Sequence, residues 1–277
     1  MTSGDVELSL SDRDLGRIVR LVYDKSGITL HEGKKSLVVA RLQKRLRHHG
    51  FTDFGAYLKH VEGAGGGEEV VALLDAIATN HTYFFREEQH FELLVKHAAD
   101  WQANHGGAKF RIWSAACSTG EENYTMTMSL KDRVPGLDFS IMGSDLSTKA
   151  LAAARAAVYK LAAVQSLPKD VLRRHFEKGM GAQEGLARVN ADVRRHNSFR
   201  NLNLLEITDL GERYEVIFCR NVMIYFDKQV QQRVVSMLER HLEPGGSLFI
   251  SHSESLNGLT HGLRWVAPAV YQRGLRA

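Results

Sequence analysis

The sequence predicts an α/β protein in which helices cover both faces of a largely parallel sheet, with an all-helical domain before the sheet and a small antiparallel β insertion within it. Two patterns predict this fold. Apolar residues recur at helical spacing over residues 9–78, and short apolar strands alternate with helices from Phe110 onward. The length of 277 residues suits two folding units. We therefore expect a helical domain over residues 1–78 and an α/β domain over residues 79–277.

The helical domain is predicted to contain four helices. Leu15, Ile18 and Val22 recur along one side of the first helix, which we expect to end at Gly27, because glycine commonly terminates helices. The other expected helices run from near His31 to Gly50, from Phe54 to Val61 and from Glu68 to Ala78, with a glycine-rich turn over residues 63–67 between the last two.

The second of these helices concentrates positive charge. Residues 41–49 contain four formal cations and no acid. Three of the cations recur at helical intervals and therefore share one face. We call the four residues the basic stripe: Arg41, Lys44, Arg45 and Arg47. Such a stripe is either a solvated helix face or a docking surface for an acidic partner.

In the second domain, strands are predicted from short apolar runs rich in β-formers, and helices from the amphipathic segments that follow them. Ser147 is expected to cap a helix that ends near Tyr159, and Pro244–Gly246 to end another. The glycine-rich and then alternating stretch Gly179–Val193 predicts a hairpin within an insertion of about residues 175–198. The expected strands are 110–116, 139–144, 214–219 and 247–251, and the expected helices are 121–131, 147–159 and 228–242.

Polar residues follow two of these strands, at the sheet edge where open α/β folds bind ligands. The turn Ser118–Glu122 contains one glycine and two acids. Asp145 follows the next strand, where a carboxylate can accept hydrogen bonds from both hydroxyls of a ribose. The two acids would repel a pyrophosphate, and the sequence has neither a dinucleotide nor a P-loop fingerprint here. The pattern favours a nucleoside without phosphates that carries positive charge, such as S-adenosylmethionine.

Composition excludes several classes of protein. A hydrophobic content of 44% with 25% charged residues is typical of globular chains, and a net charge of +4 does not indicate a nucleic-acid binder. Cys117 and Cys219 lack the spacing of a metal site or a disulfide framework. Either thiol could be a nucleophile near a strand end, but a buried core cysteine is commoner, so we assign them no chemistry. No apolar run is long enough to cross a bilayer. We expect a cytoplasmic protein with no metal, no nucleic-acid partner and no membrane insertion.

Five motifs occur in order along the chain. They are Asn-His-Thr-Tyr-Phe-Phe-Arg at 80–86, Trp-Ser-Ala-Ala-Cys-Ser-Thr-Gly-Glu-Glu at 113–122, Gly-Ser-Asp-Leu at 143–146, Asn-Leu-Leu at 203–205 and Cys-Arg-Asn-Val-Met-Ile-Tyr-Phe-Asp at 219–227. Together they resemble the CheR-type glutamate O-methyltransferases of chemotaxis receptors, from about residue 10 to residue 273. The resemblance implies a Rossmann-like class I methyltransferase sheet, S-adenosylmethionine as cofactor, and methyl esterification of chemoreceptor glutamates.

The resemblance also implies roles for individual residues. Arg86 and Tyr225 match positions at the methyl-transfer centre, and the basic stripe would dock the acidic helices of the receptor. Cys117 and Asn123 depart from the family pattern, and neither is an implied contact. Cofactor contacts are implied for Asn80, Thr82, Arg86, Glu122, Asp145, Asn203, Leu204, Arg220 and Asn221.

A glutamate carboxylate is already anionic near neutral pH, so the transfer needs no general base. Arg86 could grip this carboxylate and Tyr225 could hydrogen-bond to it. Two other classes remain as alternatives. A nucleotide sensor or scaffold would be expected to lose groups such as these two. A nucleic-acid methyltransferase would explain the basic stripe, but the sequence after Cys219 lacks a base-methylating motif.

The partners implied by the resemblance are the cytoplasmic domains of chemoreceptors, and we expect a monomeric enzyme. In the family, a subdomain at the position of the insertion can tether the enzyme to the receptor's C-terminal tail. The exposed edge of a small sheet can accept such a peptide as an added strand. A hairpin that only covers the main sheet is the alternative.

Overall fold

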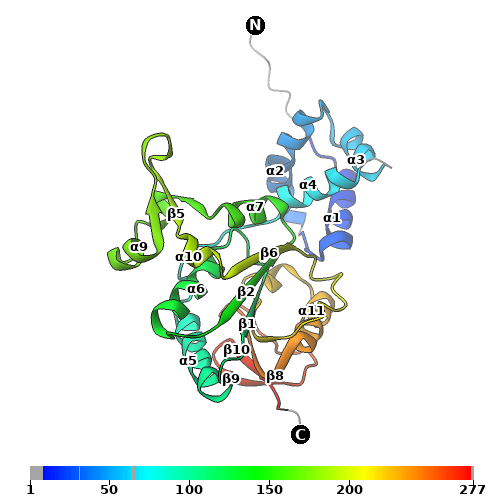
Figure 1. The fold of residues 1–277 in the computed structure, drawn as a ribbon. Helices are drawn as coiled ribbons and strands as arrows, with labels where there is room; N and C mark the ends of the chain where they lie inside the picture. The colour runs from blue at the N-terminus through cyan, green and yellow to red at the C-terminus, as the bar shows by residue number, and fades with distance from the viewer. Residues whose placement is uncertain (1–8, 31, 64–65, 276–277) are drawn as a thin grey trace.

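The computed structural model describes residues 9–30, 32–63 and 66–275. It consists of a helical N-terminal domain, an α/β domain, and an arm that projects from the α/β domain beside the helical domain (Figure 1). The predicted fold class is confirmed. His31, the predicted start of the second helix, and residues 64–65 of the glycine-rich turn lie outside the described residues.

The described part of the N-terminal domain contains four α-helices around an apolar core. The Ser11 hydroxyl caps the first helix by accepting a hydrogen bond from Asp14 N at 3.1 Å, and Gly27 ends that helix at φ 71° as predicted. The core includes the fully buried Ile18 and Leu42. The helices are α1 (Asp12–Ser26), α2 (Lys35–His48), α3 (Phe54–Glu62) and α4 (Gly67–Ile77), with a 3-10 turn over Glu32–Lys34 before α2.

A buried carboxylate on α4 joins three of these helices. Glu69 is 5% exposed; it accepts hydrogen bonds from Tyr57 Oη on α3 at 2.7 Å and from Arg45 Nε on α2 at 3.0 Å, and it lies 2.7 Å from His49 Nε2. Burial by itself would raise the pKa of Glu69, but hydrogen bonds from these three partners lower that pKa to about 2. An ionised carboxylate is therefore part of the core of this domain.

The α/β domain is built on a seven-stranded sheet with the strand order β6-β2-β1-β7-β8-β10-β9. The first five strands are parallel, and β10 is antiparallel to both of its neighbours. The strands are β1 (Phe110–Ala115), β2 (Phe139–Asp145), β6 (Asn197–Asn201), β7 (Tyr214–Phe218), β8 (Leu242–Phe249), β9 (Leu263–Ala267) and β10 (Val270–Arg273).

Helices cover both faces of this sheet, because neighbouring strand residues point to opposite sides. Ile112 packs with residues of α5 and α6, whereas Trp113 packs with residues of α11. The Ser147 hydroxyl accepts a hydrogen bond from Ala150 N at 3.0 Å, which confirms the predicted cap. None of the described helices is long and apolar enough to span a membrane. The covering helices are α5 (Gln89–Asn104), α6 (Glu121–Arg133), α7 (Thr148–Ala156) and α11 (Lys228–His241).

The β insertion is a three-stranded antiparallel sheet that forms the arm (Figure 1). Its central strand β5 (Leu186–Val189) pairs with β3 (Val158–Lys160) on one side and with β4 (Phe176–Lys178) on the other. The predicted hairpin corresponds to β4 and β5, but β3 lies before the predicted start at residue 175. The arm also contains α8 (Leu161–Val164), α9 (Lys169–His175), a 3-10 turn (Gly181–Gln183) and, after β5, α10 (Ala191–Arg194).

Several predicted boundaries are wrong, because long-range pairing overrides the local pattern. The pattern predicts a helix that ends near Tyr159, but α7 ends at Ala156 and Tyr159 pairs with Ala187 in the arm. Pro244–Gly246 lie within β8, whereas the pattern predicts a helix stop before a later strand. The insertion is predicted to run to about residue 198, but the edge strand of the main sheet already begins at Asn197. The sequence pattern does not predict α5, β9 or β10.

Backbone and side-chain contacts join the two domains at the end of α1. Asn203 Nδ2 donates to the Lys25 carbonyl oxygen at 2.7 Å, and Thr29 N donates to the Tyr225 carbonyl oxygen at 2.8 Å. Asn203 follows β6 and Tyr225 follows β7. The helical domain therefore rests on loops at the carboxyl ends of the parallel strands.

Glu69→Gln should lower the free energy of unfolding of the helical domain by about 3 kcal/mol at pH 7, because Arg45 loses the charge that compensates its own. The folded-state pKa lies below the ordinary value of 4.5, so the stabilisation by Glu69 is present above pH 4.5 and is lost as the pH falls toward 2. The difference between variant and wild type should shrink over that range. Urea unfolding followed by circular dichroism measures it, and hydrogen exchange assigns the change to this domain.

Glu68→Gln is the matched control, because Glu68 is the exposed neighbour of Glu69 on the same helix. It should leave the free energy of unfolding unchanged. Equal stability of wild type and Glu69→Gln at pH 7 would contradict the structural role of this carboxylate.

Candidate functional site

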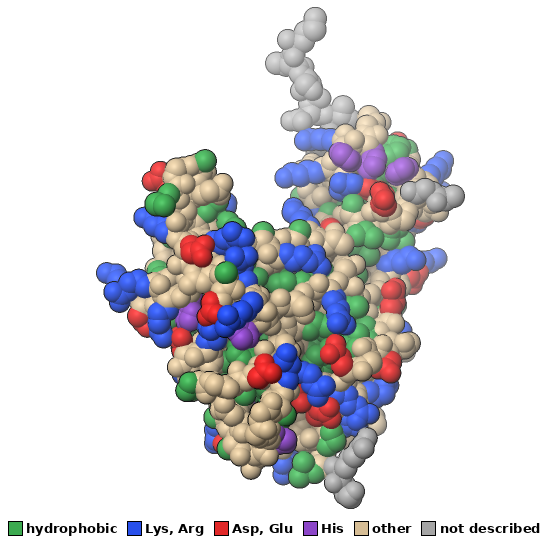
Figure 2. Space-filling model, in the orientation of Figure 1, with side chains coloured by type: hydrophobic (Ala, Val, Ile, Leu, Met, Phe, Trp, Pro, Cys, Tyr) green, Lys and Arg blue, Asp and Glu red, His purple; other side chains and the backbone are tan. Residues whose placement is uncertain are grey.

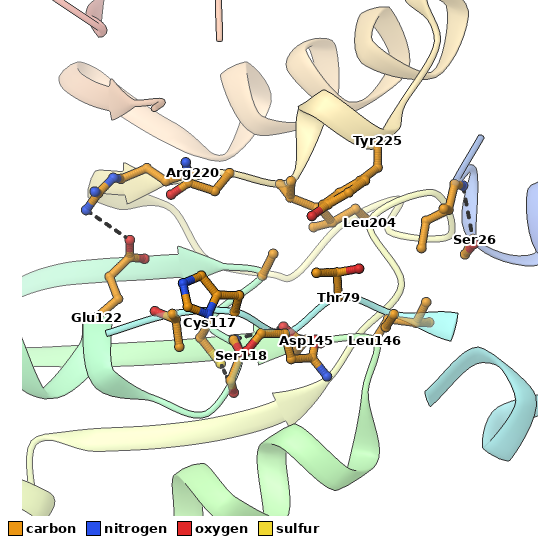
Figure 3. Close-up of a pocket in the computed structure, with 18 of the residues that line it drawn as sticks. Ser26, Thr79, Cys117, Ser118, Glu122, Asp145, Leu146, Leu204, Arg220 and Tyr225 are labelled. Atoms are coloured by element: carbon orange, nitrogen blue, oxygen red, sulfur yellow. Dashed lines mark hydrogen bonds and ion pairs between the residues drawn. The ribbon is translucent and has the colours of Figure 1, made fainter. Parts of the chain in front are cut away.

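A cavity lies at the carboxyl ends of β1, β2 and β7, where the helical domain meets the sheet (Figure 3). The structure brings ten residues from the five sequence motifs together in its lining. These are all the residues to which the resemblance gives a role in cofactor binding or methyl transfer: Asn80, Thr82, Arg86, Glu122, Asp145, Asn203, Leu204, Arg220, Asn221 and Tyr225.

Asp145 lies at the end of β2 and is 8% exposed. Its two carboxylate oxygens each accept a backbone hydrogen bond at 2.8 Å, one from Ser118 N and one from Ser147 N. Burial raises the pKa of Asp145, and these backbone donors oppose that rise. A carboxylate oxygen has two lone pairs, so both oxygens retain the capacity to accept a hydroxyl. Asp145 can therefore fix the turn after β1 and bind a ligand at the same time.

A buried ion pair occupies one end of the cavity (Figure 3). The Arg220 guanidinium is 1% exposed; its Nη1 lies 3.2 Å from Glu122 Oε2, and its Nη2 donates to the Arg86 carbonyl oxygen at 2.6 Å. Ser114 Oγ donates to the other oxygen of Glu122 at 2.7 Å. Burial raises the pKa of Glu122, while the charge of Arg220 opposes that rise. Arg220 thus orients Glu122 and the main chain at Arg86.

Arg86 lies between α4 and α5 and is partly exposed. Its Nη1 donates to the His81 carbonyl oxygen at 3.0 Å, and its guanidinium carbon lies 5.7 Å from the ring centroid of Tyr83. A guanidinium has five N–H donors in a planar fork. Arg86 therefore retains donors with which it can bind a carboxylate in the cavity.

Tyr225 lies in the 3-10 turn η3 (Met223–Tyr225) after β7, across the cavity from Asp145 (Figure 3). Its carbonyl oxygen accepts the hydrogen bond from Thr29 described above, which anchors the turn to the helical domain. A phenol hydroxyl can donate one hydrogen bond and accept others. Tyr225 can therefore hydrogen-bond to a group held in the cavity.

Two asparagines in the lining use their side-chain amides within the protein. Asn203 Nδ2 donates to Lys25, and Asn203 Oδ1 accepts from Leu205 N at 3.1 Å. Asn221 Nδ2 donates to Ser251 Oγ at 2.6 Å. These side-chain amides therefore hold the loops that line the cavity.

Strained backbone conformations concentrate around the cavity. Five non-glycine residues in or beside its lining adopt positive φ, where an L-residue is disfavoured by about 1–2 kcal/mol. Such conformations persist where surrounding contacts impose them, as the bond from Ser118 N to Asp145 does. The residues are Phe85 (59°), Glu87 (57°), Ala116 (71°), Ser118 (51°) and Asn221 (59°).

Cys117 lines the cavity, and Cys219 follows β7. Both side chains are buried, and burial raises the pKa of each thiol well above its ordinary value. The reactive form of cysteine is the thiolate. The structure therefore disfavours a nucleophilic role for either cysteine.

The basic stripe divides into two pairs of residues. Arg41 donates to the Ile77 carbonyl oxygen and, at 3.2 Å, to Thr79 Oγ1, and Arg45 pairs with Glu69, so these two arginines join α2 to α4 and the segment after it. Lys44 and Arg47 are exposed. Lys and Arg side chains also lie along the edge of the helical domain that faces the arm across a hollow (Figure 2).

Sequence reasoning missed the part of the cavity that the helical domain supplies. Ser26 and Ile28 at the end of α1 and Thr79 after α4 all line it. No local pattern marks these residues, because domain packing alone brings them to the strand ends. Sequence reasoning also missed Glu87 and Glu254, which bond to the loop after β7. Glu87 directly follows the 80–86 motif, and this adjacency could have marked it.

Comparisons with known proteins give the family. The protein-family model described as CheR methyltransferase, all-alpha domain, matches residues 13–78. A second family model, described as CheR methyltransferase, SAM binding domain, matches residues 80–271.

Several curated chemotaxis protein methyltransferases are similar to this chain over nearly its whole length. The one from Salmonella typhimurium is 39% identical over 268 residues, which cover 95% of this chain and 91% of that protein. The one from Escherichia coli is 39% identical over 269 residues, which cover 95% and 92%. The one from Borreliella burgdorferi is 32% identical over 278 residues, which cover 97% of each. The chain belongs to the CheR methyltransferase family.

Proposed function

We propose that the protein transfers the methyl group of S-adenosylmethionine to glutamate side chains of chemoreceptors and forms methyl esters that serve chemotactic adaptation. The observation that supports this most directly is the composition of one cavity, in which the carboxylates Asp145 and Glu122 lie with the guanidinium of Arg86 and the phenol of Tyr225. Family membership supports the class of reaction. We place the enzyme in the cytoplasm, where it would act as a monomer on the cytoplasmic domains of receptors.

The cavity suits S-adenosylmethionine, which supplies a methyl group bound to a sulfonium ion. Asp145 would accept hydrogen bonds from the ribose hydroxyls, because it ends β2 and keeps free lone pairs. Glu122 would face the positive charge of the amino group or the sulfonium. Leu146 and Leu204 offer apolar surface to the adenine ring. Because Arg86 and Arg220 offset the charge of the two carboxylates, family membership rather than the charge of the lining favours S-adenosylmethionine over a pyrophosphate-bearing nucleoside.

The remaining groups suit a carboxylate as the methyl acceptor. The ordinary pKa of glutamate is about 4.3, so the attacking oxygen is already ionised and no protein base has to remove a proton. Arg86 would bind the carboxylate through its planar fork, and Tyr225 would donate a hydrogen bond to one of the oxygens. Catalysis then depends on orientation of the acceptor and on exclusion of water.

Incubation with receptor-enriched membranes and cofactor tritiated in its methyl group tests the reaction. We expect label in the receptor band that mild base releases as methanol, because carboxyl methyl esters hydrolyse under conditions in which methylated amines do not. Label that resists base would assign the acceptor to nitrogen and contradict the proposal. A receptor that stays unlabelled while the protein binds S-adenosylhomocysteine would also contradict it.

Tyr225→Phe should reduce kcat for receptor methylation about tenfold or more, because a hydrogen bond to a charged group contributes about 1.5–3 kcal/mol. The dissociation constant of S-adenosylhomocysteine should change less than about threefold. Steady-state kinetics and calorimetry measure the two quantities. Tyr271→Phe, in strand β10 away from the cavity, is the matched control and should change neither. If Tyr225→Phe keeps the wild-type kcat, the phenol has no part in the reaction.

Asp145→Ala should weaken binding of S-adenosylhomocysteine more than about tenfold, because two ribose hydroxyls lose a charged acceptor. Calorimetric titration measures the dissociation constant. Asp138→Ala removes an exposed carboxylate just before the start of the same strand and should leave binding unchanged. An unaltered dissociation constant in Asp145→Ala would mean that this carboxylate only accepts the two backbone hydrogen bonds, from Ser118 N and Ser147 N, and does not bind the cofactor.

We further propose that the helical domain docks the receptor and that the arm binds its tail. Lys44 and Arg47 are exposed cations on α2, and methylatable receptor helices are acidic, so the two surfaces would attract. In the arm, the sheet order places β3 and β4 at the two edges. An extended tail peptide could add to either edge as a further strand, and the arm would then raise the local concentration of enzyme at the receptor.

The double variant Lys44→Glu and Arg47→Glu should raise the KM for receptor about three- to tenfold and flatten its dependence on salt, without changing cofactor affinity. Deleting the receptor's C-terminal tail should raise the KM of the wild type and of this variant by the same factor, because the two contacts are separate. Methylation kinetics at two salt concentrations measure all four combinations.

The matched control reverses Lys96 and Lys109, which are exposed cations outside the basic stripe. It should leave the KM unchanged. Wild-type kinetics in the Lys44 and Arg47 variant would contradict a docking role for these two cations. If deletion of the tail leaves the KM for receptor unchanged, the arm does not bind the tail and only covers the main sheet.

A further inference from the structure

The loop that follows β7 carries Arg220, Asn221 and Tyr225, and two carboxylates outside the cavity lining hold it in place. Glu87 precedes α5 and Glu254 follows β8. Neither carboxylate is among the cavity-lining residues, and the proposed reaction assigns no role to either. Both nevertheless bond to the segment that presents Tyr225.

Glu254 accepts backbone hydrogen bonds from two different loops. Its Oε2 accepts from Ser251 N at 2.8 Å and from Asn221 N at 3.1 Å, and its Oε1 accepts from Met223 N at 2.9 Å. Asn221 has φ 59°, a left-handed conformation that asparagine adopts more readily than most residues and that the bond to Glu254 helps to hold. Met223 begins the 3-10 turn that ends at Tyr225. One carboxylate therefore fixes both Asn221 and the first residue of the turn.

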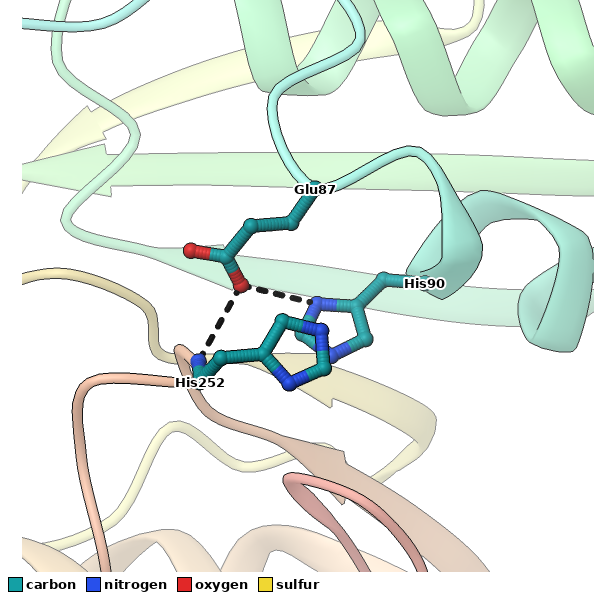
Figure 4. A group of neighbouring side chains, drawn as sticks. All are labelled: Glu87, His90 and His252. Atoms are coloured by element: carbon teal, nitrogen blue, oxygen red, sulfur yellow. Dashed lines mark hydrogen bonds and ion pairs between the residues drawn. The ribbon is translucent and has the colours of Figure 1, made fainter.

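Glu87 also supports this loop, and Figure 4 shows its contacts with His252 N and with His90. It accepts a hydrogen bond from Ser251 Oγ at 2.8 Å and from His252 N at 3.2 Å, and it lies 3.4 Å from Arg220 Nη2. Ser251 in turn accepts the amide hydrogen bond of Asn221. The loops after β7 and β8 are thus bonded to each other and to both carboxylates.

Glu87, His90 and His252 lie close enough together to resemble a metal site, and neither buried ring nitrogen of His90 has a hydrogen-bond partner among the described residues. The two imidazole rings, however, are stacked on each other, with centroids 4.6 Å apart and planes at 25°. The Arg220 cation also lies against Glu87. We therefore treat Glu87 as an acceptor for protein donors.

We propose that Glu254 is a positioning residue for methyl transfer, which holds the 221–225 turn so that the Tyr225 hydroxyl is presented to the acceptor carboxylate. This inference rests on the proposed function of Tyr225. The two oxygens of Glu254 have different roles. The Oε1 bond to Met223 N reaches the turn and would act on turnover, whereas the Oε2 bond holds Asn221, an expected cofactor contact.

Replacement of Glu254 by glutamine separates these two effects. The glutamine side chain would keep one oxygen, which could retain the bonds from Ser251 N and Asn221 N, while its NH₂ group would face the N–H of Met223 and could not accept from it. The cofactor side of the loop would stay anchored and the turn at Met223 would be released. A glutamine is nearly the size of a glutamate, so packing is conserved.

The experiment compares Glu254→Gln with Glu239→Gln, in which an α11 carboxylate that accepts a backbone hydrogen bond from Gly262 is changed in the same way. For Glu254→Gln we expect kcat to fall about tenfold, the dissociation constant of S-adenosylhomocysteine to change less than about threefold, and amide hydrogen exchange over residues 221–225 to accelerate. Glu239→Gln should change none of these three quantities.

A double-mutant cycle then tests whether Glu254 acts through Tyr225. In a Tyr225→Phe background, Glu254→Gln should cost less than about threefold in kcat, because the hydroxyl that it positions is already absent. Full additivity of the two changes, equal losses in kcat and in cofactor affinity, or unchanged exchange over residues 221–225 would each overturn the proposal. Failure of this inference can be told apart from failure of the proposed function. If the proposed function is wrong, the wild-type protein forms no base-labile ester, and the exchange measurement still shows whether Glu254 holds the turn.

Discussion

The cavity depends on the contacts that compensate the buried charge of the Arg220 guanidinium. It contacts Glu122 at the start of α6 at 3.2 Å, donates to the Arg86 carbonyl oxygen at 2.6 Å and lies 3.4 Å from Glu87, with two phenylalanine rings beside it. An isolated buried charge costs several kcal/mol, so the chain has to bring acids and a carbonyl to this point. Compensating this single charge therefore sets the positions of three segments that are distant in the sequence.

The cavity also depends on the contact between domains. Tyr23 on α1 donates to Asp227, the cap of α11, at 2.6 Å, and the end of α1 contributes Ile28 to the lining. Arg41 on α2 bonds to the segment around Thr79, which lines the cavity as well. The helix that carries the basic stripe is thus connected by hydrogen bonds to the wall of the cavity.

The sequence predicted the parts of the fold that rest on local chemistry. The cap at Ser147 and the helix end at Gly27 could be predicted, because each depends on residues within one turn of the chain. The arm was predicted only in part, since β3 joins β5 across more than 20 intervening residues. The edge strand β6 was missed for a similar reason, because its short polar sequence becomes a strand only by pairing with β2.

For the site, the sequence by itself determined which residue types stand at the strand ends, and the motif resemblance named ten residues that the structure gathers in one cavity. Tertiary structure alone decided how each is used. Arg220 faces inward to Glu122, and Arg45 of the basic stripe is bound to Glu69, because a charge that becomes buried must find a partner wherever the fold supplies one. Spacing along the chain shows which side chains can share a face, but only packing decides which of them remain available to a ligand.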